Sequence, residues 1–496
     1  MMRNIFIISM FLIVAFSCKK ESKDMPTYEP QSGNWKTGWI DVQQREFIDE
    51  SGRFVNIRGI NARVNGLFDV AHSDGRTPNE IVPEFTKEDV QMMAAWGFNT
   101  LRLPINWSGY EPEKGVFDAT YLNRIKEVVA WCKEVGIYVQ LDWHFDAWSK
   151  EIGEDGAPYW AIIPGQSNYT VEGILNFNTL SLLRANPLVF KSYYSFFKNK
   201  EGILDEYFKC WTQIIEAFKN EPAVIGYEPL NEPLAFGSGI SPQEFMDFYV
   251  ACSEKMRAID QRHSLWLEPD ALRNITDNSP LLEKPFPDKK IVYCPHYYPN
   301  LTQNLTAYEV SIWKKLIQKG LNRIEVEGKS WDAPVCINEW GINPKIIQGK
   351  TNIQAMREMM EDRYLHSEYW LWKEPRPGTS GGDGTWGFFN HLGGNDQWEV
   401  NEDAKKNAIV PYVMAISGKY NYHRFDTNTR ILTCTFTENG QLGNPIVYIN
   451  PDWYPEGFDI FINDEPVTFE SDSYNRHGIV WTPGKGQYTL EVRPNE

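Results

Sequence analysis

The stretch AVIGYEPLNEP at residues 223–233 shows most directly how this chain folds. Its first residues, Ala223–Tyr227, are rich in β-branched and aromatic side chains, which predicts a buried strand with Glu232 at its C-terminal end. The stretch APVCINEWG at residues 333–341 repeats this plan and places Glu339 at the end of a second strand. Two carboxylates at the mouth of one pocket are the minimum equipment for cleaving a glycosidic bond, because one can protonate the leaving oxygen while the other attacks the anomeric carbon.

Strand-like and helix-like runs alternate on both sides of these stretches, from about residue 35 to residue 405. The predicted strands are Phe54–Asn61, Asn99–Ile105, Gly136–His144, Val224–Glu232, Leu265–Glu268, Ile291–Tyr298, Val335–Glu339 and Glu368–Trp372. Amphipathic runs predict helices between them, at Ala119–Glu134, Asp205–Lys219, Pro242–Asp260, Ala307–Lys319, Ile353–Tyr364 and after an N-cap at Thr86. This alternation predicts an α/β protein with a (β/α)8 TIM barrel over residues 34–408, whose chemistry sits at the C-terminal strand ends.

The remaining segments of the chain have a different texture. Residues 409–496 contain short strand-like runs separated by Gly, Pro, Asn and Asp turns, which predicts an all-β sandwich domain. Residues 145–205 form a long connection after the third strand, and such a connection in a barrel indicates a lid or a substrate-shaping loop.

The N-terminus reads as a targeting segment. A basic start is followed by a short apolar run, Ile5–Phe16, and by Ser17 and Cys18. This pattern resembles a bacterial lipoprotein signal at residues 1–18, which would be removed while Cys18 is lipidated; an ordinary secretory signal is the alternative. Residues 19–33 are polar and predict a flexible tether. We therefore expect a protein anchored by lipid to a bacterial envelope, on either face of the outer membrane.

Composition narrows the classes of partner. The chain of 496 residues carries 19 Trp, 24 Tyr and 27 Phe, which suits a protein that stacks sugars on aromatic rings, although most of these rings will be core residues. A net charge of −17 argues against nucleic acid as a partner. Apart from Cys18, the cysteines are scattered without short-spaced pairs, which argues against disulfides and a zinc site.

A Glu before Pro is weak evidence by itself, since Glu228 and Glu268 show how readily Glu-Pro recurs here without chemistry. Polar residues at the ends of other predicted strands strengthen the prediction that Glu232 and Glu339 are catalytic. Arg102 could fix the Glu339 carboxylate bidentately and keep it ionised. The sugar hydroxyls would be bound by Asp142, His144 and Asn231, the last of these at the 2-hydroxyl.

Three aromatic residues and one histidine complete the predicted site. Tyr298 could hold the nucleophile in position, and His296 could support the acid/base. Trp370 and Trp372 share one face of the last predicted strand by its period of two, so one of them should form the floor under the sugar.

This ordered set, from Arg102 through Glu232 and His296 to Glu339 and a strand-eight Trp, resembles glycoside hydrolase family 5. The resemblance implies a retaining, double-displacement mechanism with Glu232 as acid/base and Glu339 as nucleophile, their carboxyl groups about 5–5.5 Å apart. It also implies that no metal or organic cofactor is needed.

A narrower resemblance points to the endoglycoceramidase branch of that family. It rests on the motifs LDWHFD at 141–146, GAPYWA at 156–161, SFFKN at 195–199 and INPDWYP at 449–455, although Phe145 stands where that branch usually has Gln. The branch cleaves the bond between sugar and ceramide in glycosphingolipids and carries a C-terminal β-sandwich. The aromatic run Tyr193–Phe197 could then line a channel for the lipid, or it could simply be the buried face of a helix.

Two alternatives to this substrate remain open from the sequence. One is an endo-β-1,4-glycanase acting on glucan, mannan or xyloglucan with the same catalytic residues. The other is a surface lipoprotein that binds glycans without cleaving them. In each case we expect a monomer whose partners are a glycan or glycolipid and, through its lipid, the membrane.

Overall fold

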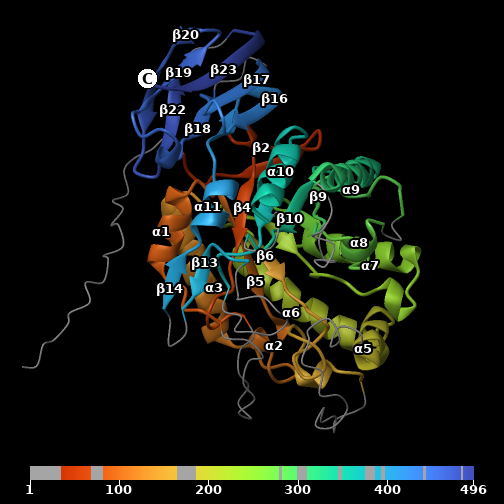
Figure 1. Ribbon diagram of the computed structural model, residues 1–496. Coiled ribbons are helices and arrows are strands. Elements are labelled where there is room, and N and C mark those ends of the chain that lie inside the picture. The colour runs from red at the N-terminus through yellow and green to blue at the C-terminus, as the bar shows by residue number, and fades with distance from the viewer. Residues whose placement is uncertain are drawn as a thin grey trace, which may run out of the picture.

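A closed barrel of parallel strands forms the centre of the molecule (Figure 1). The computed structural model describes residues 35–68, 82–164, 186–278, 282–298, 310–344, 349–374, 386–392, 397–438, 443–481 and 484–495. The barrel strands are β4 (Arg58–Asn61), β5 (Thr100–Ile105), β6 (Tyr138–Trp143), β7 (Val224–Glu228), β8 (Ser264–Leu267), β9 (Ile291–Tyr293), β10 (Cys336–Trp340) and β11 (His366–Tyr369). Every neighbouring pair is parallel, and parallel bridges from Tyr293 to Val335 and from His296 to Glu339 close β9 onto β10. The predicted TIM barrel is confirmed.

Helices surround the barrel, and capping residues in the sequence mark where they begin and end. The longer ones are α1 (Lys87–Ala95), α3 (Ala119–Val135), α6 (Ile203–Phe218), α7 (Pro242–Arg257), α9 (Val310–Trp331) and α10 (Gly349–Glu361). At the start of α3 the Asp118 side chain accepts hydrogen bonds from the first backbone N–H groups, and the helix ends at Gly136 with a φ of 74°, where glycine avoids the strain of a side chain. Ser241 and Glu244 form a capping box at the start of α7. Among the described residues, no helix has the length and apolar character needed to cross a membrane.

The long connection after β6 contains helical structure of its own. Its described parts include η1 (Tyr159–Ala161), α5 (Pro187–Phe197) and η2 (Lys200–Gly202). In α5 the aromatic rings of Tyr193 and Phe196 are fully buried against the rest of the barrel, whereas Tyr194 is exposed. The amphipathic-helix reading of this run therefore accounts for most of it.

Two antiparallel sheets pack face to face as a sandwich around a separate apolar core. One sheet has the order β1 (Ile40–Gln43), β2 (Glu46–Asp49), β3 (Phe54–Val55), β15 (Tyr412–Ile416), β18 (Ile446–Tyr448), β22 (Arg476–Val480) and β21 (Thr468–Ser471). The other has the order β16 (Gly418–Asp426), β17 (Ile431–Glu438), β23 (Gly486–Pro494), β19 (Phe458–Ile462) and β20 (Glu465–Pro466). The predicted C-terminal β domain is therefore present.

The N-terminal strands require a correction to the predicted elements. The single strand expected over Phe54–Asn61 is two strands, of which β3 pairs with β15 in the sandwich and only β4 belongs to the barrel. Strands β1–β3 thus join the C-terminal sheet although they lie within the range 34–408 assigned to the barrel. Pairing of β3 with β15 depends on residues more than 300 positions apart, which no local pattern reveals. The predicted signal and tether, residues 1–33 with Cys18, lie outside the described residues.

The sandwich packs on the barrel face opposite the C-terminal strand ends. Hydroxyl groups of Tyr412 and Tyr448 donate to the backbone oxygens of Gly97 and Ala95 at the end of α1, at 2.7 and 3.2 Å. Arg476 Nη1 likewise donates to the Val135 oxygen at the end of α3. Helix ends of this kind lie beside the N-terminal ends of the barrel strands that follow them, so the opposite face is left for chemistry.

Three short strands complete the structure beyond the barrel. β12 (Lys373–Glu374), β13 (Phe389–His391) and β14 (Trp398–Val400) form a small sheet, followed by the short helix α11 (Glu402–Ala408). This segment packs beside α1 and carries the chain from β11 to the sandwich (Figure 1).

Candidate active site

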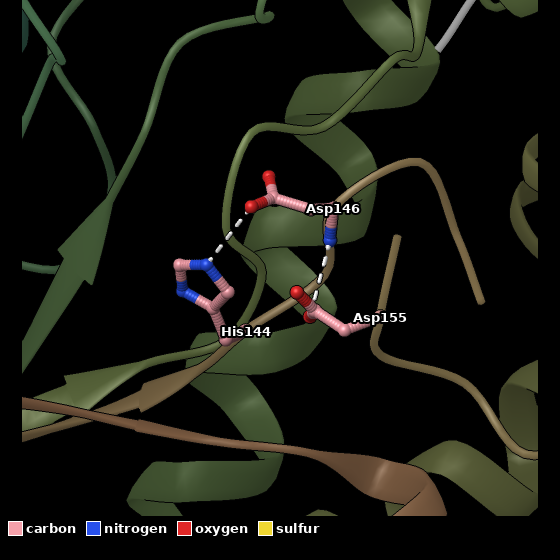
Figure 2. A group of neighbouring side chains, drawn as sticks. All are labelled: His144, Asp146 and Asp155. Atoms are coloured by element: carbon pink, nitrogen blue, oxygen red, sulfur yellow. Dashed lines mark hydrogen bonds and ion pairs between the residues drawn. The ribbon is translucent and has the colours of Figure 1, made fainter. Parts of the chain in front are cut away.

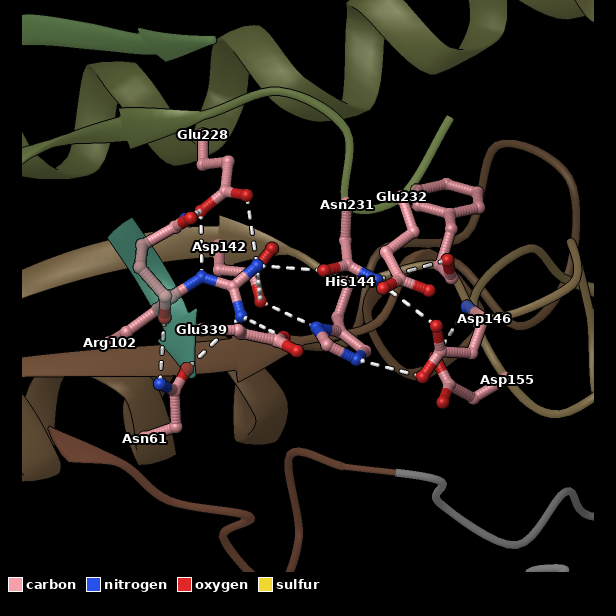
Figure 3. Close-up of polar contacts among 12 residues, drawn as sticks. Asn61, Arg102, Asp142, His144, Asp146, Asp155, Glu228, Asn231, Glu232 and Glu339 are labelled. Carbon is pink, nitrogen blue, oxygen red and sulfur yellow. Dashed lines mark hydrogen bonds and ion pairs between the residues drawn. The ribbon is translucent and has the colours of Figure 1, made fainter. Parts of the chain in front are cut away.

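Glu232 and Glu339 meet over the C-terminal end of the barrel, from the loop after β7 and from β10 (Figure 3). Nδ1 of His296 lies 2.9 Å from Oε1 of Glu232 and 3.2 Å from Oε2 of Glu339. The contacting atoms of all three residues lie within 4.8 Å of one another. This closeness is compatible with the spacing of about 5–5.5 Å between the two carboxyl groups of retaining glycosidases.

Arg102 lies behind this pair and organises the carboxylates of the barrel interior (Figure 3). Its Nη1 donates to Oε1 of Glu339 at 2.6 Å, while Nε and Nη2 donate to the two oxygens of Glu228, each at 2.8 Å. The expected bidentate contact therefore goes to Glu228, and Glu339 receives a single hydrogen bond. Burial opposes the charge of Arg102, but Asp142, Glu228 and Glu339 raise its pKa well above the ordinary value.

Tyr298 holds the other oxygen of Glu339. Its hydroxyl donates to Oε2 at 2.7 Å, so the two carboxylate oxygens are fixed from opposite sides by Tyr298 and Arg102. Burial, the Glu339 charge and the hydrogen bond raise the pKa of Tyr298 well above its ordinary value, so this hydroxyl keeps its proton. A carboxylate held in this way presents a fixed lone pair to an incoming carbon.

Glu232 is held by a different set of groups. Its Oε1 accepts a hydrogen bond from Nδ2 of Asn274, which lies in the short helix α8 (Arg273–Thr276). The same oxygen faces Nδ1 of His296. Asn231, the preceding residue, is fully buried: its Oδ1 accepts from Arg102 at 2.8 Å and its Nδ2 donates to Asp146 at 3.2 Å. The amide expected to reach a sugar hydroxyl is thus engaged within the protein in this structure.

Asp142 lies between Arg102 and His144. Its carboxylate is fully buried, 3.0 Å from Arg102 Nη2 and 2.6 Å from His144 Nδ1, and burial raises its pKa to about 6. Asp142 thus orients His144 from below, and its predicted bond to a sugar hydroxyl stays a prediction. Asp146 takes the forward position, because Nε2 of His144 lies 3.2 Å from its Oδ2 (Figure 2). The available signal was that Asp146, like His144, follows shortly after the end of β6.

The two tryptophans of the last strand point to different places. Both lie beyond the end of β11, so the strand period that was expected to align them does not apply. Trp372 packs against Trp96 and donates Nε1–H to Asp89 of α1, outside the barrel, which excludes it from the site. Trp370 stacks on the His144 ring at 5.7 Å with an interplanar angle of 9°. Trp370 is therefore the candidate floor under the sugar.

Several site residues were missed by the sequence reading. Glu228 and Glu268 were regarded as Glu-Pro repeats without chemistry, yet Glu228 pairs with Arg102 and Glu268 Oε1 lies 2.8 Å from His296 Nε2. Both stand at strand ends, which was the available signal. Arg63, just beyond β4, is buried with its guanidinium over the rings of Trp370 and Phe68.

Clusters of His and carboxylate groups at metal-ligand spacing occur in three places among the described residues. They are His144 with Asp146 and Asp155 (Figure 2), Glu228 with Glu268 and His296, and Glu232 with His296 and Glu339. In each cluster the imidazole lies within 3.2 Å of a carboxylate, so contacts between the imidazole and the carboxylates account for the grouping.

Comparison with known proteins gives one family and one fold. The family model for cellulases (glycosyl hydrolase family 5) matches residues 48–375. Endoglycoceramidase I of Rhodococcus hoagii is 24% identical over 470 residues, covering 90% of this chain and 86% of that protein. Endoglycoceramidase of Cyanea nozakii is 28% identical over 211 residues, which cover only 42% of its length. The structure of endoglycoceramidase II from Rhodococcus sp. with ganglioside GM3 superposes with a TM-score of 0.72 at 22% identity, over 90% of this chain and 99% of that one, which establishes a common fold.

Proposed function

The chain belongs to glycosyl hydrolase family 5, and on this premise we propose that it cleaves the bond between sugar and ceramide in glycosphingolipids. The observation that carries the chemistry is the Glu232–His296–Glu339 cluster, whose spacing suits a retaining enzyme. Support for the substrate comes from the endoglycoceramidase of Rhodococcus hoagii, because that likeness extends over 90% of this chain and includes the sandwich.

In the proposed first step Glu339 attacks the anomeric carbon while Glu232 gives its proton to the glycosidic oxygen. Arg102 and Tyr298 fix the attacking carboxylate, so little reorganisation is needed to reach the transition state. Ceramide leaves as a neutral alcohol, and the sugar remains bound to Glu339 as an ester. In the second step Glu232 removes a proton from water, which releases the sugar and restores both carboxyl groups.

The sugar itself would be held by the residues around Trp370. We propose that its ring packs on the C–H surface of the sugar, while His144, which stacks on Trp370, and Asp146, which contacts His144, bind hydroxyl groups. Asp146 joins Asp142 as a proposed partner of a sugar hydroxyl. Asn231 keeps its proposed contact with the 2-hydroxyl of the sugar. To make that contact, its side chain would give up its hydrogen bond to Asp146.

An exposed apolar residue lies on the side where the lipid would leave. The acid/base stands next to the leaving group, so the chain just after Glu232 borders the aglycone. There η3 (Phe236–Ser238) presents Phe236, which is 52% exposed, and packs on α5 with its exposed Tyr194. We propose that this phenylalanine, four residues after Glu232 in the chain, contacts the apolar part of the leaving group.

Product analysis tests the proposal directly. Protein lacking residues 1–33 would be incubated with lactosylceramide, glucosylceramide, β-mannan and β-glucan, with Glu339→Gln as the inactive control. Release of intact lactose together with free ceramide is the expected result. Oligosaccharides from a polysaccharide with the lipids untouched would instead identify an endo-β-1,4-glycanase, and binding without products from any substrate would identify a glycan-binding protein.

We further propose that Cys18 is lipidated and anchors the enzyme to a bacterial envelope as a monomer. The support is the basic start, the apolar run and Ser17-Cys18. Metabolic labelling with a radioactive fatty acid should mark the wild-type chain and not a Cys18→Ser variant. Light scattering of protein lacking residues 1–33 should give the mass of one chain, and a multiple of that mass would overturn the expectation of a monomer.

A further inference from the structure

Glu268 lies directly behind the acid/base and contacts both the backbone of Glu232 and the ring of His296. Neighbouring strands β7, β8 and β9 bring Glu232, Glu268 and His296 side by side at their C-terminal ends. Oε2 of Glu268 accepts the backbone N–H of Glu232 at 3.1 Å, and Oε1 lies 2.8 Å from Nε2 of His296. The other ring nitrogen of His296, Nδ1, faces Oε1 of Glu232 at 2.9 Å. A continuous line of polar atoms therefore runs from Glu268 through the imidazole to the acid/base.

The hydrogen bond from the Glu232 backbone to Glu268 stabilises an unusual backbone conformation at Glu232. Glu232 has a φ of 41°, in the left-handed region that costs a residue with a side chain of the order of 1 kcal/mol or more. The hydrogen bond to the buried Glu268 carboxyl, whose residue is 1% exposed, offsets that strain and fixes where the acid/base side chain starts.

We propose that Glu268 is a positioning residue that relays a proton to His296 each time Glu232 changes its charge. When Glu232 gives its proton to the leaving oxygen, the proton of Glu268 passes from Oε1 to Nε2 of His296. The imidazolium then donates Nδ1–H to the new Glu232 carboxylate. When Glu232 takes a proton from water in the second step, the relay proton returns to Glu268, so the turnover ends as it began. The proposal rests on the acid/base role of Glu232 in the proposed function.

The surroundings of Glu268 suit a group that holds a proton and can release it. Burial raises the pKa of Glu268 well above its ordinary value, His296 opposes this, and the charge of Glu228 raises it further. Burial lowers the pKa of His296, but the charges of Glu268 and Glu339 raise it well above its ordinary value, so His296 takes up the proton when Glu268 gives it up. The titratable and charged groups that face this pair come from every neighbouring element: Arg102, Glu228, Glu232, Tyr249, Cys294, Tyr298 and Glu339.

Two synthetic substrates separate this role from a structural one. Phenyl β-lactoside needs a proton on its leaving oxygen, whereas 2,4-dinitrophenyl β-lactoside leaves without one. In Glu268→Gln we expect kcat/KM to fall about tenfold to a hundredfold for the phenyl substrate and less than about threefold for the dinitrophenyl substrate. The alkaline limb of kcat/KM for the phenyl substrate should move to higher pH, because Glu232 loses the imidazolium that favours its charged form.

Glu368→Gln is the matched control. Glu368 is another fully buried carboxyl of the barrel whose pKa burial raises well above the ordinary value, and neither oxygen has a hydrogen-bond partner among the described residues. It should show no difference between the two substrates. Equal losses on both substrates in Glu268→Gln, or the same pattern in Glu368→Gln, would overturn the relay. If the Gln variant does not fold, Glu268→Asp serves instead, and unchanged kinetics in that variant would also overturn it.

The outcome is independent of the lipid assignment, because neither lactoside contains ceramide. A protein that cleaves both lactosides but leaves lactosylceramide intact would refute the proposed substrate while the relay stands. A Glu232→Gln variant that treats both lactosides alike would refute the acid/base role, and the relay with it.

Discussion

At the scale of single residues, Arg102 decides which buried carboxylates of the barrel carry charge. Burial alone would raise the pKa of Glu228, but the adjoining guanidinium lowers it to about 2. Glu268 and Glu368, which have poorer contact with this cation or none, keep raised pKa values. One cation among many acids therefore sorts them into ionised and protonated groups, which is the division of roles that acid/base chemistry needs.

Removing the Tyr298 hydroxyl should weaken catalysis without weakening the fold. In Tyr298→Phe the Glu339 carboxylate loses one charged hydrogen bond of about 1.5–3 kcal/mol, so we expect kcat to fall about tenfold to a hundredfold. Steady-state kinetics with an aryl lactoside measure this. Tyr293→Phe is the control, because its hydroxyl also donates to a glutamate, Glu327, but away from the site. Equal losses in both variants would contradict the role given to Tyr298.

At the scale of elements, the two ends of the barrel have different roles: connections at one end carry the site, and those at the other contact the sandwich. The loop after β7 carries Glu232 and then the exposed Phe236 of η3, so acid and apolar surface come from one connection. The hairpin β1–β2, by contrast, lies at the opposite end of the barrel and serves the join with the sandwich.

Phe236 should matter for lipid substrates alone. In Phe236→Ser we expect kcat/KM for lactosylceramide in detergent micelles to fall about tenfold. The reason is that the variant loses about 1–2 kcal/mol of the binding free energy that apolar contact with the lipid would supply. Hydrolysis of a soluble aryl lactoside should be unchanged. Val480→Ser, a residue of the sandwich with the same 52% exposure, controls for a general effect of surface apolarity. A proportional loss on both substrates would place Phe236 in the sugar site.

Glu46 in β2 should make the stability of the protein fall as the pH rises towards neutrality. Burial raises its pKa from 4.5 to about 7, against the opposing charges of Lys419 and Arg45, so the folded state binds this proton more tightly than the unfolded state. Stability from this group is present at low pH and is lost as the pH rises from about 4.5 through 7.

Urea denaturation of Glu46→Gln measures this contribution. The Glu46 side chain is 27% exposed, so we expect the variant to gain about 1–2 kcal/mol over the wild type at pH 8 and close to nothing at pH 5. Glu50→Gln, at the exposed turn that follows, is the control. A gain for Glu46→Gln that is equal at both pH values would show that charge plays no part in it.

At the scale of the whole molecule, one buried apolar cluster joins the barrel to the sandwich, beside the sandwich's own core. The barrel-facing residues of the seven-stranded sheet, among them Phe47, Met414 and Tyr448, belong to the same buried cluster as the barrel helices. Gly97 has no side chain because the Tyr448 ring lies there: a Cβ would come within 2.4 Å of it. Separation of the two parts would expose this surface, so we regard them as one folding unit.

Calorimetry should therefore show a single unfolding transition. In Tyr448→Ala the loss of a buried ring and its hydrogen bond to Ala95 should cost about 3–5 kcal/mol and lower the temperature of the whole transition without splitting it. Tyr488→Ala, in the sandwich but partly exposed and away from the barrel, should cause a smaller shift. Two separate transitions, with only one moved by Tyr448→Ala, would show that the sandwich unfolds independently.

The sequence by itself determined the alternation of strands and helices, the barrel, the β-rich C-terminus and the positions of Glu232 and Glu339 at strand ends. These follow from patterns over a few neighbouring residues, because side-chain periodicity and capping are local. Only the tertiary structure decided that Arg102 forms its bidentate contact with Glu228 and that Asp142 lies beneath His144. It also decided that Trp372 lies outside the barrel and that β1–β3 join the sandwich. Three of these features, all except the position of Asp142, depend on which distant segments meet: Arg102 and Glu228 are 126 residues apart, and their pairing exists only once the barrel has closed.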